Sequence, residues 1–210
     1  VKQIVKQAEE KGSVNLADIT KDTKALKAGD KVYSVCMDKT VALFQIGKKK
    51  LEKGMNILGA HIDSPRMDVK QNPLYESEEF AYLDTHYYGG IKKYQWVTLP
   101  LALHGVVVKK DGTVITVNVG EDKNDPVFCV TDLLIHLAGE QMEKKANKVI
   151  EGENLDVLVG SKPLEGKEKD AVKEGILEIL KEKYDMTEED FMSAEIEVVP
   201  AGHAREAGLD

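Results

Sequence analysis

The chain has 210 residues, of which 42% are hydrophobic and 31% are charged, and its formal net charge is −8. This is the composition of an ordinary soluble globular protein. No apolar run approaches the ~20 residues that a membrane-spanning helix needs, so we expect no membrane partner. Cys36 and Cys129 are too few for a disulfide framework, which favours a cytoplasmic location.

The distribution of charge argues against a nucleic-acid partner. The basic excess lies in residues 1–54 and is spread over lysines such as Lys48, Lys49 and Lys50. A protein that binds duplex nucleic acid needs a concentrated basic stripe to release counterions, whereas this pattern is typical of a solvated surface. We therefore expect no nucleic acid as a partner.

The first part of the chain predicts half of an α/β sheet. Residues 1–11 have the apolar spacing of a helix. Two alternating runs on either side of Met37–Thr40 predict a pair of strands within residues 31–47, and the apolar run Met55–Ile62 predicts a third.

A break at Gln71–Pro73 leads into a β-rich region, in which Lys110–Gly112 has the Asp-Gly sequence of a tight hairpin turn. Thr187 and Asp190 resemble a helix capping box, although the pattern asks for Glu or Gln at the second position. The strands expected in this region are Phe80–Leu83, Val97–Lys109, Thr113–Val119 and Glu195–Val199, and the helices are Thr131–Lys148 and Lys169–Tyr184.

The segment NILGAHIDSPR, residues 56–66, carries the clearest signal of chemistry. On a strand, residues two apart share a face, so His61 and Asp63 can touch. A carboxylate that accepts the second ring N–H of a histidine makes the other nitrogen a better metal ligand. Pro65 would then end the strand, and ligands of open α/β sheets bind at that edge. The alternative is a structural histidine that is satisfied by its neighbour.

His136 lies in the expected helix with Asp132 four residues before it and Glu140 four residues after it. All three side chains would share one face, where the acids favour the protonated imidazole. From spacing alone this is either a surface charge cluster or a functional site.

The remaining histidines and the aromatic residues are weaker candidates. His86 precedes two glycines in either a strand-end turn or a flap, and His104 is expected to have a structural partner in a strand. His203 lies in a loop, and we leave it and His104 outside the site. Four aromatic residues form either a recognition surface or part of the core or an interface. These are Tyr87, Tyr88, Tyr94 and Trp96.

The segments GAHIDSPRMDVKQNPLYE, THYYGGIKKYQW, DLLIHL and VVPAGHAREAGLD together resemble the aspartyl aminopeptidase family of dinuclear zinc exopeptidases, especially its bacterial members. The resemblance covers nearly the whole chain. It implies that His61 is a zinc ligand, that Asp63 orients it, and that His136 reaches a neighbouring subunit's active site and contacts substrate there. A side chain in that position could stabilise the oxyanion that develops during hydrolysis.

The fold implied by the resemblance is α/β, in which the mixed-sheet catalytic domain of a zinc exopeptidase is interrupted by an inserted β-rich dimerisation domain. We expect residues 1–70 and 193–210 to belong to the catalytic domain and residues 71–192 to the insertion. The family's other metal ligands and its general base lie beyond residue 210. We therefore expect this chain to be an internal fragment that is inactive alone.

The function implied is a metallo-aminopeptidase that removes N-terminal residues, acidic ones in particular, from peptides. Two zinc ions would activate a bridging water, and cobalt or manganese accept overlapping ligands. The family forms closed homo-oligomers, so we expect an oligomer such as a dodecamer. The alternative is a catalytically dead assembly module, whose inserted domain only mediates contact between subunits.

Overall fold

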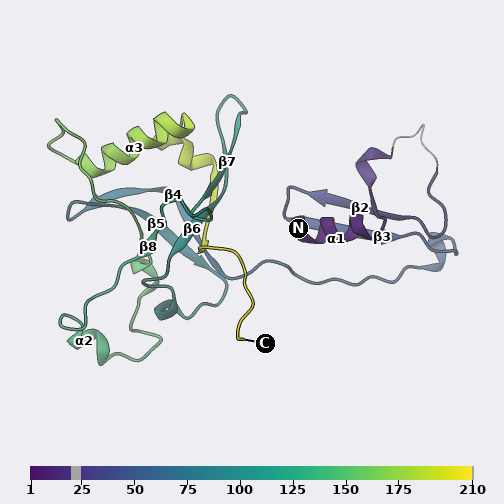
Figure 1. The fold of residues 1–210 in the computed structure, drawn as a ribbon, viewed down its shortest axis with the longest axis horizontal. Helices are drawn as coiled ribbons and strands as arrows, with labels where there is room; N and C mark the ends of the chain where they lie inside the picture. Colours follow the sequence, from purple (N-terminus) through teal and green to yellow (C-terminus); the bar gives the residue numbers. More distant parts are fainter. Residues whose placement is uncertain (20–24, 210) are drawn as a thin grey trace. The chain divides into compact units, whose positions relative to one another are not determined.

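The computed structural model describes residues 1–19 and 25–209. The chain folds into two compact units, Val1–Asp63 and Ser64–Asp210 (Figure 1). In the described ranges no helix is both long enough and apolar enough to cross a membrane.

The smaller unit combines one helix with a three-stranded sheet in the order β1-β2-β3. Met37 and Asp38 both take positive φ, the conformation of tight hairpin turns, and antiparallel β2 and β3 lie on either side of them. The predicted helix and both strands are therefore confirmed. The elements are α1 (Lys2–Glu10), β1 (Val14–Asn15), η1 (Leu16–Asp18), β2 (Lys31–Cys36), β3 (Thr40–Gln45) and η2 (Leu51–Lys53).

The strand expected at Met55–Ile62 is wrong, because residues 54–65 have no regular secondary structure. A strand forms only where its N–H and C=O groups pair with a neighbouring strand, and within the described residues none pairs with this segment. Its apolar side chains are correspondingly exposed, with Leu58 fully accessible and Ile57 at 80%.

The larger unit is built on a curled antiparallel sheet of seven strands in the order β7-β6-β10-β4-β5-β9-β8. Its strands are β4 (Arg66–Ser77), β5 (Phe80–Tyr88), β6 (Leu101–Val108), β7 (Val114–Val119), β8 (Cys129–Val130), β9 (Val157–Gly160) and β10 (Ala194–Pro200). Its helices are η3 (Lys93–Gln95), α2 (Gly139–Met142), η4 (Gly152–Asn154), α3 (Ala171–Tyr184) and η5 (Glu188–Ser193). The chain as a whole thus has the expected mixed α/β fold.

The predicted break at Gln71–Pro73 is also wrong, because β4 runs through it. The register of β4 against β5 shifts between Val69 and Leu74, and Pro73 lies fully buried inside that irregularity. Proline has no N–H to donate to the ladder, so a bulge is one of the few places in a sheet where it is tolerated.

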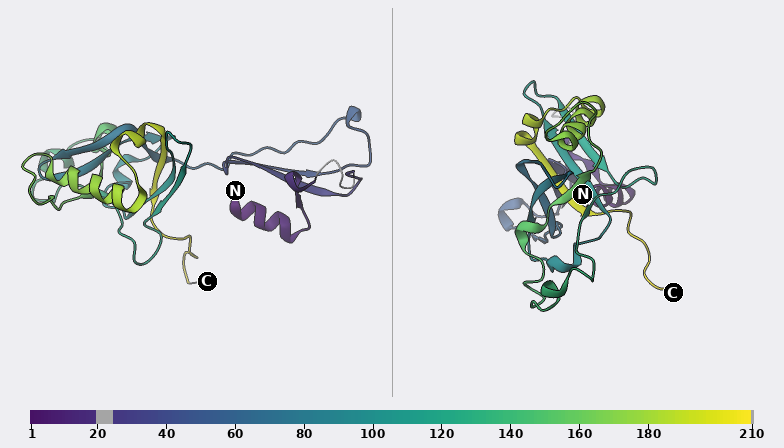
Figure 2. Two further views of the ribbon diagram at one scale, coloured as in Figure 1. Left: turned by 90° about the horizontal axis from the view of Figure 1, so that it is seen from above. Right: turned by 90° about the vertical axis from the view of Figure 1, so that its left-hand side faces the viewer.

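Helix α3 covers one face of the seven-stranded sheet (Figure 2). The helix expected at Lys169–Tyr184 is confirmed as α3. Val172 is buried, and Ile176, Leu180 and Tyr184 pack against the core, whereas Ile179 is 45% exposed. Gly160 of β9 lets the helix approach, because a Cβ there would lie 2.7 Å from Ile176 Cδ1. The core is centred on Met67, Leu101, Val107, Leu155, Val157 and Val198.

The predicted strand Glu195–Val199 is present as β10, and the capping box at Thr187 and Asp190 is present at the start of η5. We expected this strand to re-enter a catalytic sheet, whereas here it lies between β6 and β4 in the sheet of the larger unit. The functional boundaries at residues 70 and 192 stay a prediction.

The helix expected at Thr131–Lys148 is wrong, and only Gly139–Met142 is helical, as α2. Short helices depend on packing an apolar face against a core. Here Leu133, Leu134 and Leu137 are more than half exposed and only Ala138 is buried, so no such face is available.

A polar network lies where β4, β5 and β9 meet. Tyr75 Oη donates to Asp156 Oδ2 over 2.5 Å, while Lys70 Nζ lies 2.8 Å from Asp84 Oδ1. Asp156 Oδ1 is buried and has no hydrogen-bond partner among the residues that the structure describes. Burial raises the pKa of Asp156, the hydrogen bond from Tyr75 opposes this, and the nearby charge of Asp84 adds to it, so the pKa stays above its ordinary value.

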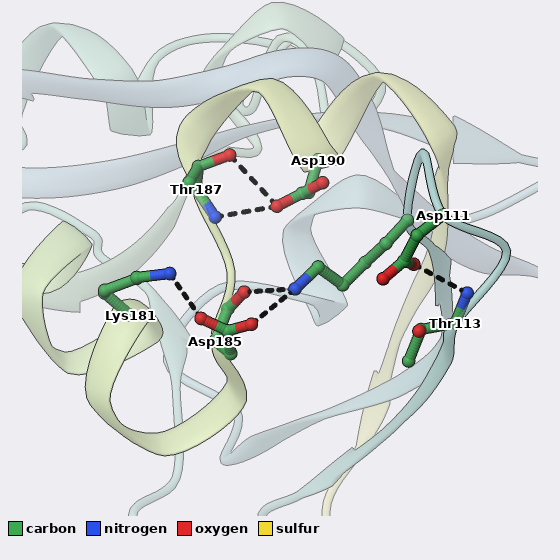
Figure 3. Close-up of polar contacts among 7 residues, drawn as sticks. Asp111, Thr113, Lys181, Asp185, Thr187 and Asp190 are labelled. Atoms are coloured by element: carbon green, nitrogen blue, oxygen red, sulfur yellow. Dashed lines mark hydrogen bonds and ion pairs between the residues drawn. The ribbon is translucent and has the colours of Figure 1, made fainter.

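A second network joins the β6–β7 hairpin to the end of α3. Figure 3 shows Asp185 beside Lys181, and Lys109 Nζ also lies 2.6 Å from Asp185 Oδ2. The hydrogen bond from Lys109 is the main cause that lowers the pKa of Asp185 to about 2. Asp185 ends α3 with a φ of 52°, a conformation that Asn also tolerates.

We expect Asp185→Asn to lower the free energy of unfolding at neutral pH. In this variant the free energy of unfolding should also change less as the pH falls. Because the folded pKa is depressed, the contribution of Asp185 is complete above its unfolded pKa of 3.8 and is lost as pH falls through about 2. Urea midpoints measured between pH 2 and 7 test this. The control is Glu189→Gln, which breaks a more exposed ion pair with Lys110 and should change the dependence of the urea midpoint on pH less. Identical pH dependences for Asp185→Asn and the unmodified protein would contradict the prediction.

Candidate metal-binding segment

His61 and Asp63 contact each other, as expected. His61 Nδ1 lies 3.3 Å from Asp63 Oδ1, and the two side chains are 88% and 50% exposed. The contact arises within an irregular segment rather than from the alternation of a strand. The roles of His61 as a metal ligand and of Asp63 as its orienting residue stay predictions.

The donor atoms on this chain fit a metal only in part. With Nδ1 facing Asp63, Nε2 is the ring nitrogen that His61 can offer. Across residues 1–19 and 25–209, no group of three or more His, Cys, Asp or Glu side chains could hold a metal ion. A catalytic zinc takes about three protein ligands, and the described residues do not bring three such side chains together.

Arg66 follows the His61–Asp63 pair closely and has no place in the predicted site. Its Nε lies 2.8 Å from Asp68 Oδ1 and 3.1 Å from Glu197 Oε1, and its Cζ lies 4.3 Å from the centre of the Tyr88 ring. Only its position directly after Ser64 and Pro65 in the motif could have drawn attention to it.

His136 lies in a turn over residues 135–137 and is exposed. The argument that it shares a helical face with Asp132 and Glu140 is therefore wrong. Asp132 Oδ1 instead accepts from the Leu133 N–H and from Gln141 Nε2, each over 2.8 Å. The role of His136 in a neighbouring active site stays a prediction.

Exposed apolar side chains surround His136. Ile135 is 66% exposed and Leu137 is 71% exposed. Contiguous exposed apolar side chains commonly mark an interaction surface. We call this exposed run, Leu133–Leu137, the apolar turn.

The other histidines and the aromatic residues have mainly structural surroundings. His104 Nε2 lies 2.8 Å from Glu121 Oε1, which confirms the structural partner expected for it. His86 lies near the end of β5 with its ring centre 5.4 Å from that of Tyr87. Tyr87 and Trp96 pack against the core, in agreement with the interpretation that the aromatic residues are structural. Tyr88 and Tyr94 are exposed.

Comparison with known proteins identifies the family. The sequence profile described as "Aminopeptidase I zinc metalloprotease (M18)" matches residues 1–210. A probable M18 family aminopeptidase 1 from Clostridium acetobutylicum is 62% identical over 211 residues, which are 100% of this chain and 45% of that protein. The chain thus spans less than half the length of the curated relatives that it matches.

Solved structures give the same result. Aminopeptidase I from Clostridium acetobutylicum has a TM-score of 0.86 at 61% identity, and the match covers 98% of this chain and 45% of that one. An M18-family aminopeptidase from Thermotoga maritima has a TM-score of 0.84 at 48% identity over 95% of this chain and 43% of that one. The chain therefore belongs to the aminopeptidase I family of zinc metalloproteases, M18.

Proposed function

We propose that this chain is part of a zinc aminopeptidase that removes N-terminal residues, acidic ones in particular, from peptides. The observation that carries the proposal is the match of the whole chain to a family of zinc metalloproteases, together with the His61–Asp63 contact inside it. The cytoplasmic location and the lack of nucleic-acid and membrane partners stay predictions.

His61 and Asp63 act together in this proposal. Asp63 Oδ1, which lies 3.3 Å from His61 Nδ1, would accept a hydrogen bond from Nδ1–H, fix the tautomer and leave Nε2 free to hold a metal. The metal, when bound, polarises the scissile carbonyl and lowers the pKa of the attacking water. We propose two zinc ions, with cobalt or manganese as possible substitutes, and further ligands and a general base from residues outside this chain.

We further propose that His136 acts across a subunit boundary in a homo-oligomer. The apolar turn supports this, because its exposed side chains can be buried against a second subunit. The solved structure of yeast mApe1, which shares the fold at 15% identity and a TM-score of 0.57, is described as a dodecamer. In this proposal, His136 contacts a substrate that is bound in the neighbouring subunit.

A second candidate function is a catalytically dead assembly module. One observation favours it: among the described residues no three metal-binding side chains come together, while the apolar turn is exposed. The rest of the gene distinguishes the two functions, because only the aminopeptidase requires the remaining ligands and the general base.

Peptide hydrolysis tests the proposed function directly. We expect the full-length protein to release N-terminal aspartate from short peptides and to stop when a chelator removes its metal. The 210-residue chain should bind zinc weakly and cleave nothing, because its described residues bring together no three side chains that could hold a metal ion. Hydrolysis by this shorter chain that is insensitive to chelator would overturn the proposal.

Substitutions at His61 and Asp63 test their separate roles. Asp63→Asn in the full-length protein should lower metal affinity or activity by about 10- to 100-fold, the usual cost of losing an orienting partner. His61→Ala should lower them further, because a ligand is lost. Metal content by mass spectrometry and the rate of hydrolysis are the measurements, and negligible effects of both variants would show that the pair is structural.

The role of His136 is tested by complementation. His136→Phe should leave metal content and oligomer size unchanged while lowering kcat by about 10²-fold or more, as for the loss of one oxyanion donor. Mixing it with His61→Ala should restore part of the activity, because some interfaces then pair an intact metal site with an intact histidine. If subunits exchange and no activity returns, His136 does not act in trans.

A further inference from the structure

Two aspartates face each other where β5 meets the start of β9. The two strands pair in antiparallel register at Leu83 and Val157. The next step in this register places Asp84 opposite Asp156. Thr85 Oγ1 donates to the carbonyl oxygen of the residue before Asp156 over 2.5 Å, which keeps the two backbones side by side here. Opposite side chains on antiparallel strands have Cβ atoms about 5 Å apart, and like charges in such positions destabilise the sheet.

One carboxyl oxygen of Asp156 lacks a donor. Oδ2 accepts the hydrogen bond from Tyr75 Oη over 2.5 Å, whereas Oδ1 is buried and has no partner in the part of the chain that the structure describes. Leaving a buried acceptor unpaired is costly, because the group has lost its hydrogen bonds to water. Protonation would turn Oδ1 into a donor, and the carboxylate of Asp84 on the opposite strand is an acceptor for it.

The charges around the two aspartates differ. Lys70 Nζ lies 2.8 Å from Asp84 Oδ1, and the Asp84 side chain is 32% exposed. Within residues 1–19 and 25–209 no Lys, Arg or His forms an ion pair with Asp156, so the positive charge lies beside the other member of the pair. The remaining titratable groups around the two aspartates come from β4, β5 and η4, and they are Tyr75, Tyr82 and Glu153.

We propose that Asp84 and Asp156 share one proton, which Asp156 donates to the Asp84 carboxylate, and that loss of this proton to solvent loosens the pairing of β9 with β5. Burial is the largest cause that raises the pKa of Asp156, the hydrogen bond from Tyr75 opposes it, and Asp84 adds to it through its charge. Because the folded pKa is raised, the proton stabilises the fold fully below the unfolded pKa of 3.8, and its contribution is lost as pH rises through the folded pKa.

Strand β9 connects the shared proton to the apolar turn. It lies between β5 and β8 in the sheet, and β8 ends at Val130, shortly before Leu133–Leu137. Repulsion between two ionised aspartates would separate the start of β9 from β5 and disturb the strand that pairs with it. The proton therefore acts on the strand from which the apolar turn extends.

Hydrogen–deuterium exchange of the full-length protein, followed by mass spectrometry between pH 4 and pH 8, tests the proposal. After correction for the intrinsic exchange rate, protection of the β9 amides should fall by about fivefold or more as pH rises, the effect of one unpaired buried oxygen. Strand β7, at the other edge of the sheet, should keep its protection and serves as the internal control. Asp156→Asn should abolish the fall, because its amide donates to Asp84 at every pH while its carbonyl oxygen still accepts from Tyr75.

Two further variants should shift the transition in opposite directions, and they keep the test valid if Asp156→Asn does not fold. Asp84→Asn should move it to lower pH, because the new amide donates to ionised Asp156. Tyr75→Phe should move it to higher pH, because the ionised form then loses a donor. Glu153→Gln is the matched control, since it removes a carboxylate from Lys70 and should leave the transition unchanged. An unshifted transition in Asp84→Asn, or a transition that persists in Asp156→Asn, would overturn the inference.

Discussion

The sheet of the larger unit depends on how closely β10 can approach β6. Gly105 makes this possible, because a Cβ at that position would lie 2.0 Å from the Glu195 carbonyl oxygen. No side chain can replace that hydrogen without separating the two backbones. Strand β10 in turn connects β7 and β6 on one side with β4, β5, β9 and β8 on the other. A single glycine therefore determines whether residues 194–200 can join the two parts of the sheet, and with them Glu197, which pairs with Arg66.

The sequence was sufficient to predict those elements whose structure is determined by interactions between residues close in the chain. The hairpin around Met37 and Asp38, helix α3 and the capping box at Thr187 all follow from short patterns, and the structure confirms them. The two failed elements, Met55–Ile62 and Thr131–Lys148, each contain apolar residues that are mainly exposed. Their apolar residues suggested burial, but whether such a segment becomes a strand or a helix depends on a partner surface, which the sequence of the segment does not contain.

In the candidate site too, contacts between residues close in sequence could be predicted, whereas contacts between distant parts of the chain could not. The contact between His61 and Asp63 could be predicted because the two residues are close in sequence, even though the strand geometry used to predict it is absent. The surroundings of Arg66 could not be predicted, because Glu197 reaches it only through the pairing of β10 with β4. Similarly, the cluster of Asp132, His136 and Glu140 was derived from helical spacing and disappears with the helix. A contact between residues four apart thus depends on the helix that would bring them together, whereas residues two apart can meet without a regular element.

The two carboxyl groups with shifted pKa values give the larger unit opposite responses to acid. Asp185 stabilises the fold when ionised, so its contribution is lost as pH falls through about 2. The pKa of Asp156 is raised, so its contribution is greatest when it is protonated and is lost as pH rises through that raised pKa. For these two groups together, stability is greatest near their shared unfolded pKa of 3.8, because Asp185 loses its contribution below that pH and Asp156 loses its contribution above it. The sheet and the helix of the larger unit thus depend on two carboxyl groups that stabilise the fold in opposite protonation states.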